Sequence, residues 1–357
     1  MNENKLNQTL AEVGERELLR LLTPYLDGVS DDVLVGVGDD AAVLSAQPFA
    51  GQCTILTADM LIEGTHFPCR PHADWQRLGI KAMVSNLSDV AAMGGQPRYA
   101  LISVGFPCSL LVREVLELYE GLSATARGYG VSIIGGDTVG ASAVVISLAV
   151  LGVLPANRRP ALRSACRPGQ RVYVSGTLGE SAAGLQLILD PKLKSLVEPT
   201  VAESLVTSHW VPTPRIALGQ ALSILCPDLA MIDISDSLYH ELSVLAEASH
   251  VGFQLNLAAL PRSAELESFC HAIREPIDKY LLFSGEEYEL LFCTSLAPED
   301  LLSTLAGMEN IPSVTPIGIV TDQPNAVEFL NEDGRPVAIS DETFEHFERR
   351  PGAQKTF

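Results

Sequence analysis

Acidic residues recur beside glycine, serine or threonine at the ends of apolar runs, and this pattern is the clearest chemical feature of the chain. It occurs five times, at Asp39-Asp40, Asp59, Asp89, Asp137 and Asp233-Ile234-Ser235-Asp236. A carboxylate in an apolar environment must be compensated by backbone amides or by a cation. One such aspartate is typically a cap or turn residue, but five sets predict a convergent metal site. Oxygen ligands without cysteine or clustered histidine favour magnesium over zinc.

Helix and strand signals alternate along the chain and would position these aspartates. In the first half, apolar spacing predicts strands over 33–37, 41–44, 53–57, 99–105, 131–137 and 143–153, and helices over about 7–22, 73–93 and 109–127. In the second half it predicts strands over 171–175 and near 253 and 289, and helices over 180–189, 214–225 and 238–249. Pro24 should stop the first helix, and Ser109 should cap the third. The alternation is typical of a layered α/β fold.

The length of 357 residues is enough for two domains with separate cores. The segment Pro155–Pro168 resembles a domain connection, so we expect domains over 1–153 and 154–357. It holds four arginines, Arg158, Arg159, Arg163 and Arg167, in a chain otherwise short of positive charge. The cluster indicates either an anion site or a solvated linker, and both readings stay open.

Composition excludes several classes of partner. The formal net charge of −20 and the pI near 4.7 disfavour nucleic acids and anionic membranes. The longest apolar stretch, Ala143–Leu154, is too short to span a bilayer, and the first residues lack a signal-peptide core. Seven scattered cysteines without a C-x-x-C pair favour a reducing cytoplasm. We therefore expect a soluble cytoplasmic protein with neither nucleic-acid nor membrane partners.

The usual phosphate-binding loops are missing from the sequence. Neither G-x-x-x-x-G-K-[ST] nor the protein-kinase motifs occur, and no glycine is followed by lysine. With acids dominating, bridging metal ions are the remaining general way to neutralise phosphate charge. Two further features are ambiguous by themselves. His66 could be a surface residue or a ligand, and the polar helix face that carries Asp89, taken alone, would be a solvated face.

Taken together, six motifs resemble those of thiamine-monophosphate kinases, which belong to the superfamily of aminoimidazole ribonucleotide synthetase. They are Gly38-Asp39-Asp40-Ala41, Thr57-Ala58-Asp59 with Glu63-Gly64-x-His66-Phe67, Asn86-Leu87-Ser88-Asp89, Gly136-Asp137-Thr138, Asp233-Ile234-Ser235-Asp236 and Gly285-Glu286-Glu287-Tyr288. The resemblance runs in order from about residue 14 to Phe347. It implies a two-domain α/β (α+β) PurM-like fold, with an N-terminal mixed-sheet domain that pairs in a homodimer and a C-terminal α/β domain that covers the cleft.

The resemblance also implies roles for individual residues. Magnesium ligands would be Asp40, Thr57, the Ala58 carbonyl, Asp59, Asp89, Asp137, Asp233 and Asp236, while Asp39 would be structural. ATP would contact Gly136, Asp137, Arg163 and Ser235. Thiamine monophosphate would contact His66, Glu286 and Phe344. The chemistry agrees, because Glu286 can bind the aminopyrimidine or the cationic thiazolium and Phe344 offers a ring for cation–π contact.

The reaction implied is ATP-dependent phosphorylation of thiamine monophosphate to thiamine diphosphate, the last step of thiamine diphosphate synthesis. We expect direct in-line transfer with several magnesium ions, and no general base or covalent nucleophile. Aminoimidazole ribonucleotide synthetase is the enzymatic alternative, disfavoured by the segment from Glu63 to Phe67 and by Glu286-Glu287-Tyr288. A non-catalytic nucleotide-binding protein is a second alternative, disfavoured by the intact acidic set.

Overall fold

The computed structural model describes residues 6–26, 33–35, 43–44, 51–68 and 73–339. The described residues form two compact units. The first runs to Val90 and resumes over Gln96–Asn157, and the second combines Ala91–Gly95 with the chain from Arg158 onward. Within the described ranges, no helix is both long enough and apolar enough to cross a membrane.

The first unit is built on a four-stranded mixed sheet. Its strand order is β3 (Gln52–Ile62), β6 (Val145–Pro155), β4 (Gln96–Phe106) and β5 (Ser132–Gly140). The first three strands pair antiparallel, and β5 pairs parallel with β4. Shorter elements precede them: α2 (Leu10–Val13), α3 (Glu15–Leu26) and the β1–β2 pair (Val33–Val35, Val43–Leu44).

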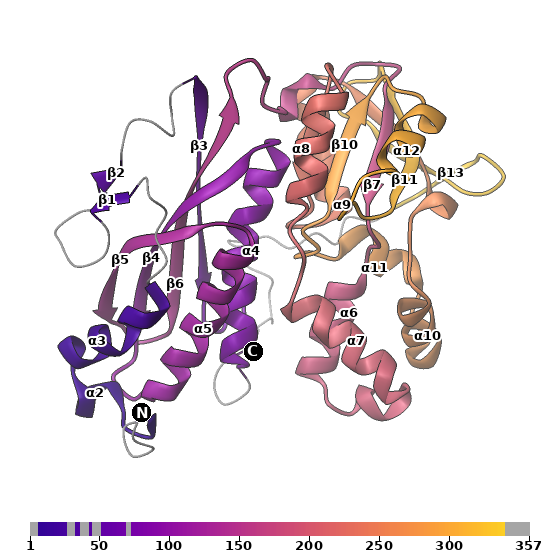
Figure 1. The fold of residues 1–357 in the computed structure, drawn as a ribbon. Helices are drawn as coiled ribbons and strands as arrows, with labels where there is room; N and C mark the ends of the chain where they lie inside the picture. Colours follow the sequence, from indigo (N-terminus) through magenta and orange to yellow (C-terminus); the bar gives the residue numbers. More distant parts are fainter. Residues whose placement is uncertain (1–5, 27–32, 36–42, 45–50, 69–72, 340–357) are drawn as a thin grey trace. The chain divides into compact units, whose positions relative to one another are not determined.

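Helices α4 (Trp75–Ala92) and α5 (Val112–Gly128) lie side by side against one face of this sheet (Figure 1). Two glycines set their close approach. A Cβ atom at Gly79 would lie 2.1 Å from the Leu118 carbonyl oxygen, and one at Gly121 would lie 2.0 Å from that of Gln76. Since the two helix backbones touch at both points, α4 packs tightly against α5.

The sheet therefore has one covered face and one open face. Burial alternates along β3, so Thr57 and Asp59 lie on the covered side while Leu56 and Met60 lie on the open side. On the far edge strand, Asp137 pairs in register with Ser103 and shares the open side.

The second unit contains a seven-stranded sheet with surrounding helices. Its strand order is β13 (Pro336–Val337), β12 (Val327–Leu330), β9 (Gly252–Asn256), β11 (Val314–Thr321), β7 (Arg171–Ser175), β10 (Leu290–Thr294) and β8 (Ala230–Asp233). The helices are α6 (Glu180–Leu189), α7 (Pro199–Trp210), α8 (Ile216–Leu225), α9 (Leu238–Ser249), α10 (Ala264–Ile273), α11 (Ile277–Phe283) and α12 (Pro298–Leu305). Three short 3₁₀ turns cover Arg163–Ala165, Leu193–Leu196 and Leu257–Ala259. In the core, Tyr173 and Phe292 stack across β7 and β10 with ring centroids 5.1 Å apart.

Two helix boundaries differ from the sequence prediction. The helix expected over 7–22 is broken at Gly14, which has φ 75°, and α3 then continues through Pro24. A proline in a last turn removes only one helical hydrogen bond, and burial of Leu18 and Leu22 outweighs that loss. Helix α5 begins after Leu111 rather than Ser109, because the Leu111 amide donates to the Glu114 carboxylate at 2.8 Å.

Three strands, β3, β4 and β5, are longer than predicted, and four helices were not predicted. Asp59 and Asp137 lie within β3 and β5 rather than at their ends, because pairing with β6 and β4 continues past them. The sequence prediction missed helices α7, α10, α11 and α12, although the buried residues of α7 recur at helical spacing (Ala202, Leu205, Val206, His209 and Trp210).

Candidate functional site

Strand β3 and helix α4 bring Thr57, Asp59 and Asp89 together in the first unit. The Thr57 hydroxyl donates to Asp89 Oδ2, and the Asp59 amide donates to Asn86 Oδ1 at 3.2 Å. The side chains of Ser85, Asn86 and Ser88 are at most 5% exposed. The polar face of α4 is therefore buried under the edge strand, and the solvated-face reading is wrong.

The electrostatics of this cluster suit a bound cation. Burial and, to a smaller extent, the nearby Asp89 carboxylate together raise the pKa of Asp59 to about 6, against the opposing effect of a hydrogen bond from Ser85. Two carboxylates and a hydroxyl offer hard oxygen donors whose mutual repulsion a divalent cation would relieve. The residues present thus fit a magnesium ion.

The peptide group between Ala58 and Asp59 presents only one polar atom to α4. Its amide, on Asp59, faces Asn86. In a trans peptide the carbonyl points the opposite way, so the Ala58 oxygen faces away from Asn86. The role of the Ala58 carbonyl as a magnesium ligand stays a prediction.

His66 lies in a tight turn that follows β3. Its amide donates to the Ile62 carbonyl at 2.9 Å, and the Ile62 amide donates back to His66 Nδ1 at 3.0 Å. Since Nδ1 accepts, the neutral ring carries its proton at Nε2. Gly64 supplies the positive φ of 80° that the turn requires, and the fully buried Phe67 anchors it. The turn thus fixes the imidazole just beyond the strand that carries Asp59.

Gly136 and Asp137 lie apart from this cluster within one chain. Strands β3 and β5 are the two edges of the sheet, three strand spacings or about 14 Å apart. Asp137 also faces the open side, whereas Asp59 faces α4. One ion therefore cannot contact both carboxylates of a single chain. Gly136 is required by close packing, because a Cβ there would lie 1.8 Å from the Ile102 carbonyl oxygen.

In the second unit, a loop after β8 gathers a second acidic group. Asp233 is 2% exposed at the end of the strand, and Ser237 caps α9 by accepting from the His240 amide at 3.1 Å. Glu241 reaches back from α9, and its Oε1 accepts from the Asp236 amide at 3.2 Å and the Ser235 hydroxyl at 3.5 Å. The loop between strand and helix is thus folded around a buried carboxyl group.

Glu241 was not predicted, and its environment is unusual. Its pKa is raised to about 8, chiefly by burial. The Asp236 amide lowers the pKa, the charges of Asp233 and Asp236 raise it, and Arg163 lowers it. Ligand atoms of Asp236, His240 and Glu241 lie within 4.8 Å of one another. The only sequence signal was an acid in the first turn of a helix, which is a common capping position. Arg163, which the sequence analysis placed in the segment between the domains, lies close enough to this acidic loop for its charge to act on Glu241.

A strained segment runs beside the same loop. Glu286 and Tyr288 have φ of 59° and 54°, a left-handed conformation that side chains other than glycine seldom adopt. The Glu286 amide donates to the Ser235 carbonyl at 2.6 Å, and the Tyr288 amide donates to that of Ile234 at 2.9 Å. Such conformations persist where surrounding contacts enforce them, and they cluster at ligand-binding sites.

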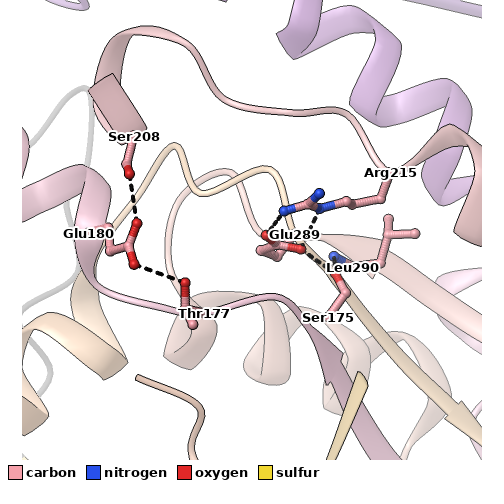
Figure 2. A network of polar contacts seen from close by, with 7 residues as sticks. All are labelled: Ser175, Thr177, Glu180, Ser208, Arg215, Glu289 and Leu290. Atoms are coloured by element: carbon pink, nitrogen blue, oxygen red, sulfur yellow. Dashed lines mark hydrogen bonds and ion pairs between the residues drawn. The ribbon is translucent and has the colours of Figure 1, made fainter. Parts of the chain in front are cut away.

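Flanking acids hold this segment in place, as Figure 2 shows for Glu289. The Glu289 carboxylate forms a paired contact with the Arg215 guanidinium and accepts from the Ser175 hydroxyl, while the Leu290 amide donates to that hydroxyl at 2.8 Å. Nearby, Glu180 accepts from the hydroxyls of Thr177 and Ser208. The Glu289 contacts tie the segment to the end of β7 and to Arg215, just before α8.

Glu287 is tied to the start of α6 in the same way. Its Oε1 accepts from the amides of Gly179 and Ser181 at 3.0 and 3.2 Å and from the Ser284 hydroxyl. Burial raises its pKa to about 8, although the Ser284 hydrogen bond opposes the shift. Glu287 and Glu289 are therefore held inside the fold. Glu286, whose amide contacts the acidic loop, has a side chain that is 24% exposed.

The structure thus forms two groups from the predicted residues. The first unit joins Thr57, Asp59 and Asp89, with His66 beyond the same strand and Gly136–Asp137 on the opposite edge. The second unit joins Arg163, Asp233, Ser235, Asp236 and Glu286. Asp40 and Phe344 lie outside the described residues. Asn86, Glu241 and Glu287 were missed as members of these groups.

Comparisons with known proteins cover nearly the whole chain. The family model described as AIR synthase related protein, N-terminal domain, matches residues 38–154, and that described as the C-terminal domain matches 167–331. The thiamine-monophosphate kinase of Bacillus subtilis (strain 168) is 32% identical over 336 residues, which are 93% of this chain and 99% of that protein.

Solved structures agree with these matches. The crystal structure of thiamine-monophosphate kinase from Stenotrophomonas maltophilia K279a is 30% identical, has a TM-score of 0.76, and covers 90% of this chain and 96% of its own. A structure of AaThiL complexed with AMPPCP and TMP is 32% identical, has a TM-score of 0.72, and covers 95% and 99%. The mixed α/β two-domain PurM-like fold expected from the sequence is thereby confirmed.

Proposed function

Because the chain belongs to the thiamine-monophosphate kinase family, within the AIR synthase-related proteins, we propose that it transfers the γ-phosphoryl group of ATP to thiamine monophosphate, giving thiamine diphosphate and ADP. The observation that carries this proposal is similarity at 32% identity over 99% of a kinase of that name. A second support is the similar structure, which holds the ATP analogue AMPPCP together with TMP. The two acidic groups supply the chemistry that such a transfer needs.

We propose magnesium as the cation at these carboxylates. Several ions would share the ligands Asp40, Thr57, Ala58, Asp59, Asp89, Asp137, Asp233 and Asp236. Bound magnesium would neutralise phosphate charge during the transfer. The support lies in the raised pKa of Asp59 and in the oxygen-only donor set around it.

The substrates have separate proposed contacts. ATP is bound by Gly136, Asp137, Arg163 and Ser235, and thiamine monophosphate by His66, Glu286 and Phe344. Glu286 suits the cationic thiazolium because its carboxylate is partly exposed on a rigid segment. The His66 ring can donate from Nε2 to a phosphate oxygen, since Nδ1 already accepts from Ile62.

Proton transfer is not required of the protein in this reaction. A phosphate monoester has a second pKa of about 6, so the acceptor oxygen is already ionised at neutral pH. His66 therefore binds thiamine monophosphate and does not act as a general base. The main barrier is electrostatic repulsion between ATP and thiamine monophosphate, which are both anions. Positioning the two substrates and neutralising their charge lowers this barrier.

We also propose that the protein is a homodimer joined through the open face of the first unit. Four large apolar side chains are exposed on that face: Leu56 (74%), Met60 (50%), Leu101 (44%) and Val139 (52%). Exposed apolar patches of this kind mark protein–protein contacts. A cytoplasmic location is proposed as well, since the cysteines among the described residues are free thiols.

A coupled ADP-release assay with purified protein tests the activity. We expect turnover with Mg-ATP and thiamine monophosphate, and at least a hundredfold lower kcat/KM with free thiamine, since an acceptor without phosphate leaves the metal site unmatched (about 10²-fold or more for a missing polar partner). Turnover of formylglycinamidine ribonucleotide instead would favour the aminoimidazole ribonucleotide synthetase alternative. ATP binding without turnover of either acceptor would favour a non-catalytic protein.

A further inference from the structure

A buried histidine lies behind Glu286. His209, in the last turn of α7, is 1% exposed, and its Nδ1 lies 3.1 Å from Ser181 Oγ and 3.9 Å from Glu286 Oε2. The first distance is a hydrogen bond; the second exceeds hydrogen-bond length and leaves an electrostatic contact. His209 thus connects a fixed hydroxyl with the carboxylate of Glu286.

The position of this imidazole is set by close packing of α7 on α6. A Cβ atom at Gly184 would lie 2.0 Å from the Leu205 carbonyl oxygen and 3.0 Å from the His209 Cβ, so the two helices touch there. Trp210 packs against the imidazole edge-on, with ring centroids 5.5 Å apart. An apolar side chain could fill this space without polar partners. The presence of a buried imidazole nitrogen here therefore suggests a polar role for His209.

Ser181 joins the two neighbouring acids. Its amide donates to Glu287 Oε1 at 3.2 Å, and its hydroxyl shares a hydrogen bond with His209 Nδ1. Glu287 is therefore anchored directly by Ser181, and Glu286 is linked to Ser181 through His209. Glu286 keeps 24% of its side chain exposed and its backbone is left-handed, so its carboxylate is accessible to a ligand while one of its oxygens contacts His209.

We propose that His209 is a positioning residue that orients the Glu286 carboxylate toward the cationic ring of thiamine monophosphate. The proposal rests on the proposed function, in which Glu286 contacts that substrate. A carboxylate already fixed in its binding geometry loses less side-chain entropy when the ligand binds. His209 therefore acts on the affinity for thiamine monophosphate and leaves ATP binding unchanged.

Steady-state kinetics of His209→Leu and His209→Asn test the proposal. For His209→Leu we expect KM for thiamine monophosphate to rise about tenfold, the loss expected for one contact to a charged group, with KM for ATP and kcat within about twofold of wild type. Asn places a polar group near the Nδ1 position and should restore most of the affinity. The matched control is His271→Asn, at an exposed position of α10, which should behave as wild type.

A double-mutant cycle separates positioning from packing. If His209 acts through Glu286, His209→Leu should raise KM no further in a Glu286→Gln background. A full additional rise there, or equal rises in KM for both substrates, would overturn the proposal. Should His209→Leu fail to fold, Ser181→Ala must give the same selective rise in KM, and its absence would be equally decisive. A wild-type enzyme that ignores thiamine monophosphate would instead refute the proposed function.

Discussion

Replacing Asp59 by Asn should stabilise the metal-free protein at neutral pH. Folding raises the pKa of Asp59 from 3.8 to about 6, so the folded state resists ionisation. A shift of about 2 units corresponds to roughly 3 kcal/mol of lost stability once both states are ionised. Weakening the hydrogen bond from Ser85 costs about 1 kcal/mol, which leaves a net gain of about 2 kcal/mol. Asn86 accepts from the Asp59 backbone amide, so that contact survives.

The pH dependence has a definite sign. Below pH 3.8 the carboxyl group is protonated in both the folded and the unfolded state, and the substitution changes little. Between pH 3.8 and about 6 the wild type loses stability as the unfolded state ionises first, and above about 6 the full difference is present. The variant lacks this group and should show no such loss.

Thermal unfolding in EDTA from pH 4 to 8 measures this difference. A gain of about 2 kcal/mol should raise the Tm of the first unit by about 4–8 °C, and the exposed Asp322→Asn should leave it unchanged. Magnesium should then stabilise the wild type and do little for Asp59→Asn. A variant that is less stable than wild type in EDTA at pH 7, or one that magnesium stabilises equally, would refute the reasoning.

Three other predictions follow from the same two acidic groups. Glu241→Gln should remove a loss of metal-free stability that wild type shows as pH rises from 4.5 to about 8, because the folded pKa of Glu241 is about 8; urea midpoints across that range measure it, and an unchanged profile would contradict the assignment. Asp89→Asn and Asp137→Asn should each lower kcat by about 10²-fold or more with the fold intact by circular dichroism, and near-normal turnover in either would remove that residue from the metal site. ATP made chiral at the γ-phosphorus should give inverted product, whereas retention would indicate an aspartyl-phosphate intermediate.

Local sequence patterns predicted the elements that depend on few distant contacts. Helices α6 and α9 begin and end where apolar spacing places them, and α4 is within two residues of its predicted bounds. The strands beside the acidic motifs were also found, although β3 and β5 run further than expected. Their ends depend on pairing with β6 and β4, which are remote in sequence.

The candidate oxygen ligands could be chosen from the sequence alone, since the recurrence of aspartate beside small residues is visible without a fold. It could not decide which carboxylates meet. Side-chain alternation in a strand and the order of strands in the sheet place Asp59 against α4 and Asp137 on the other face and edge.

Tertiary structure also decided the charge state and stiffness of the site. In the sequence, Glu241 and Glu287 look like an ordinary helix-cap acid and loop acid. The fold buries both beside other carboxylates, and this environment raises their pKa values to about 8. The left-handed backbone at Glu286 and the histidine behind it arise from contacts with α6, α7 and the loop after β8. Desolvation and long-range packing depend on the whole fold, so no local pattern could have predicted them.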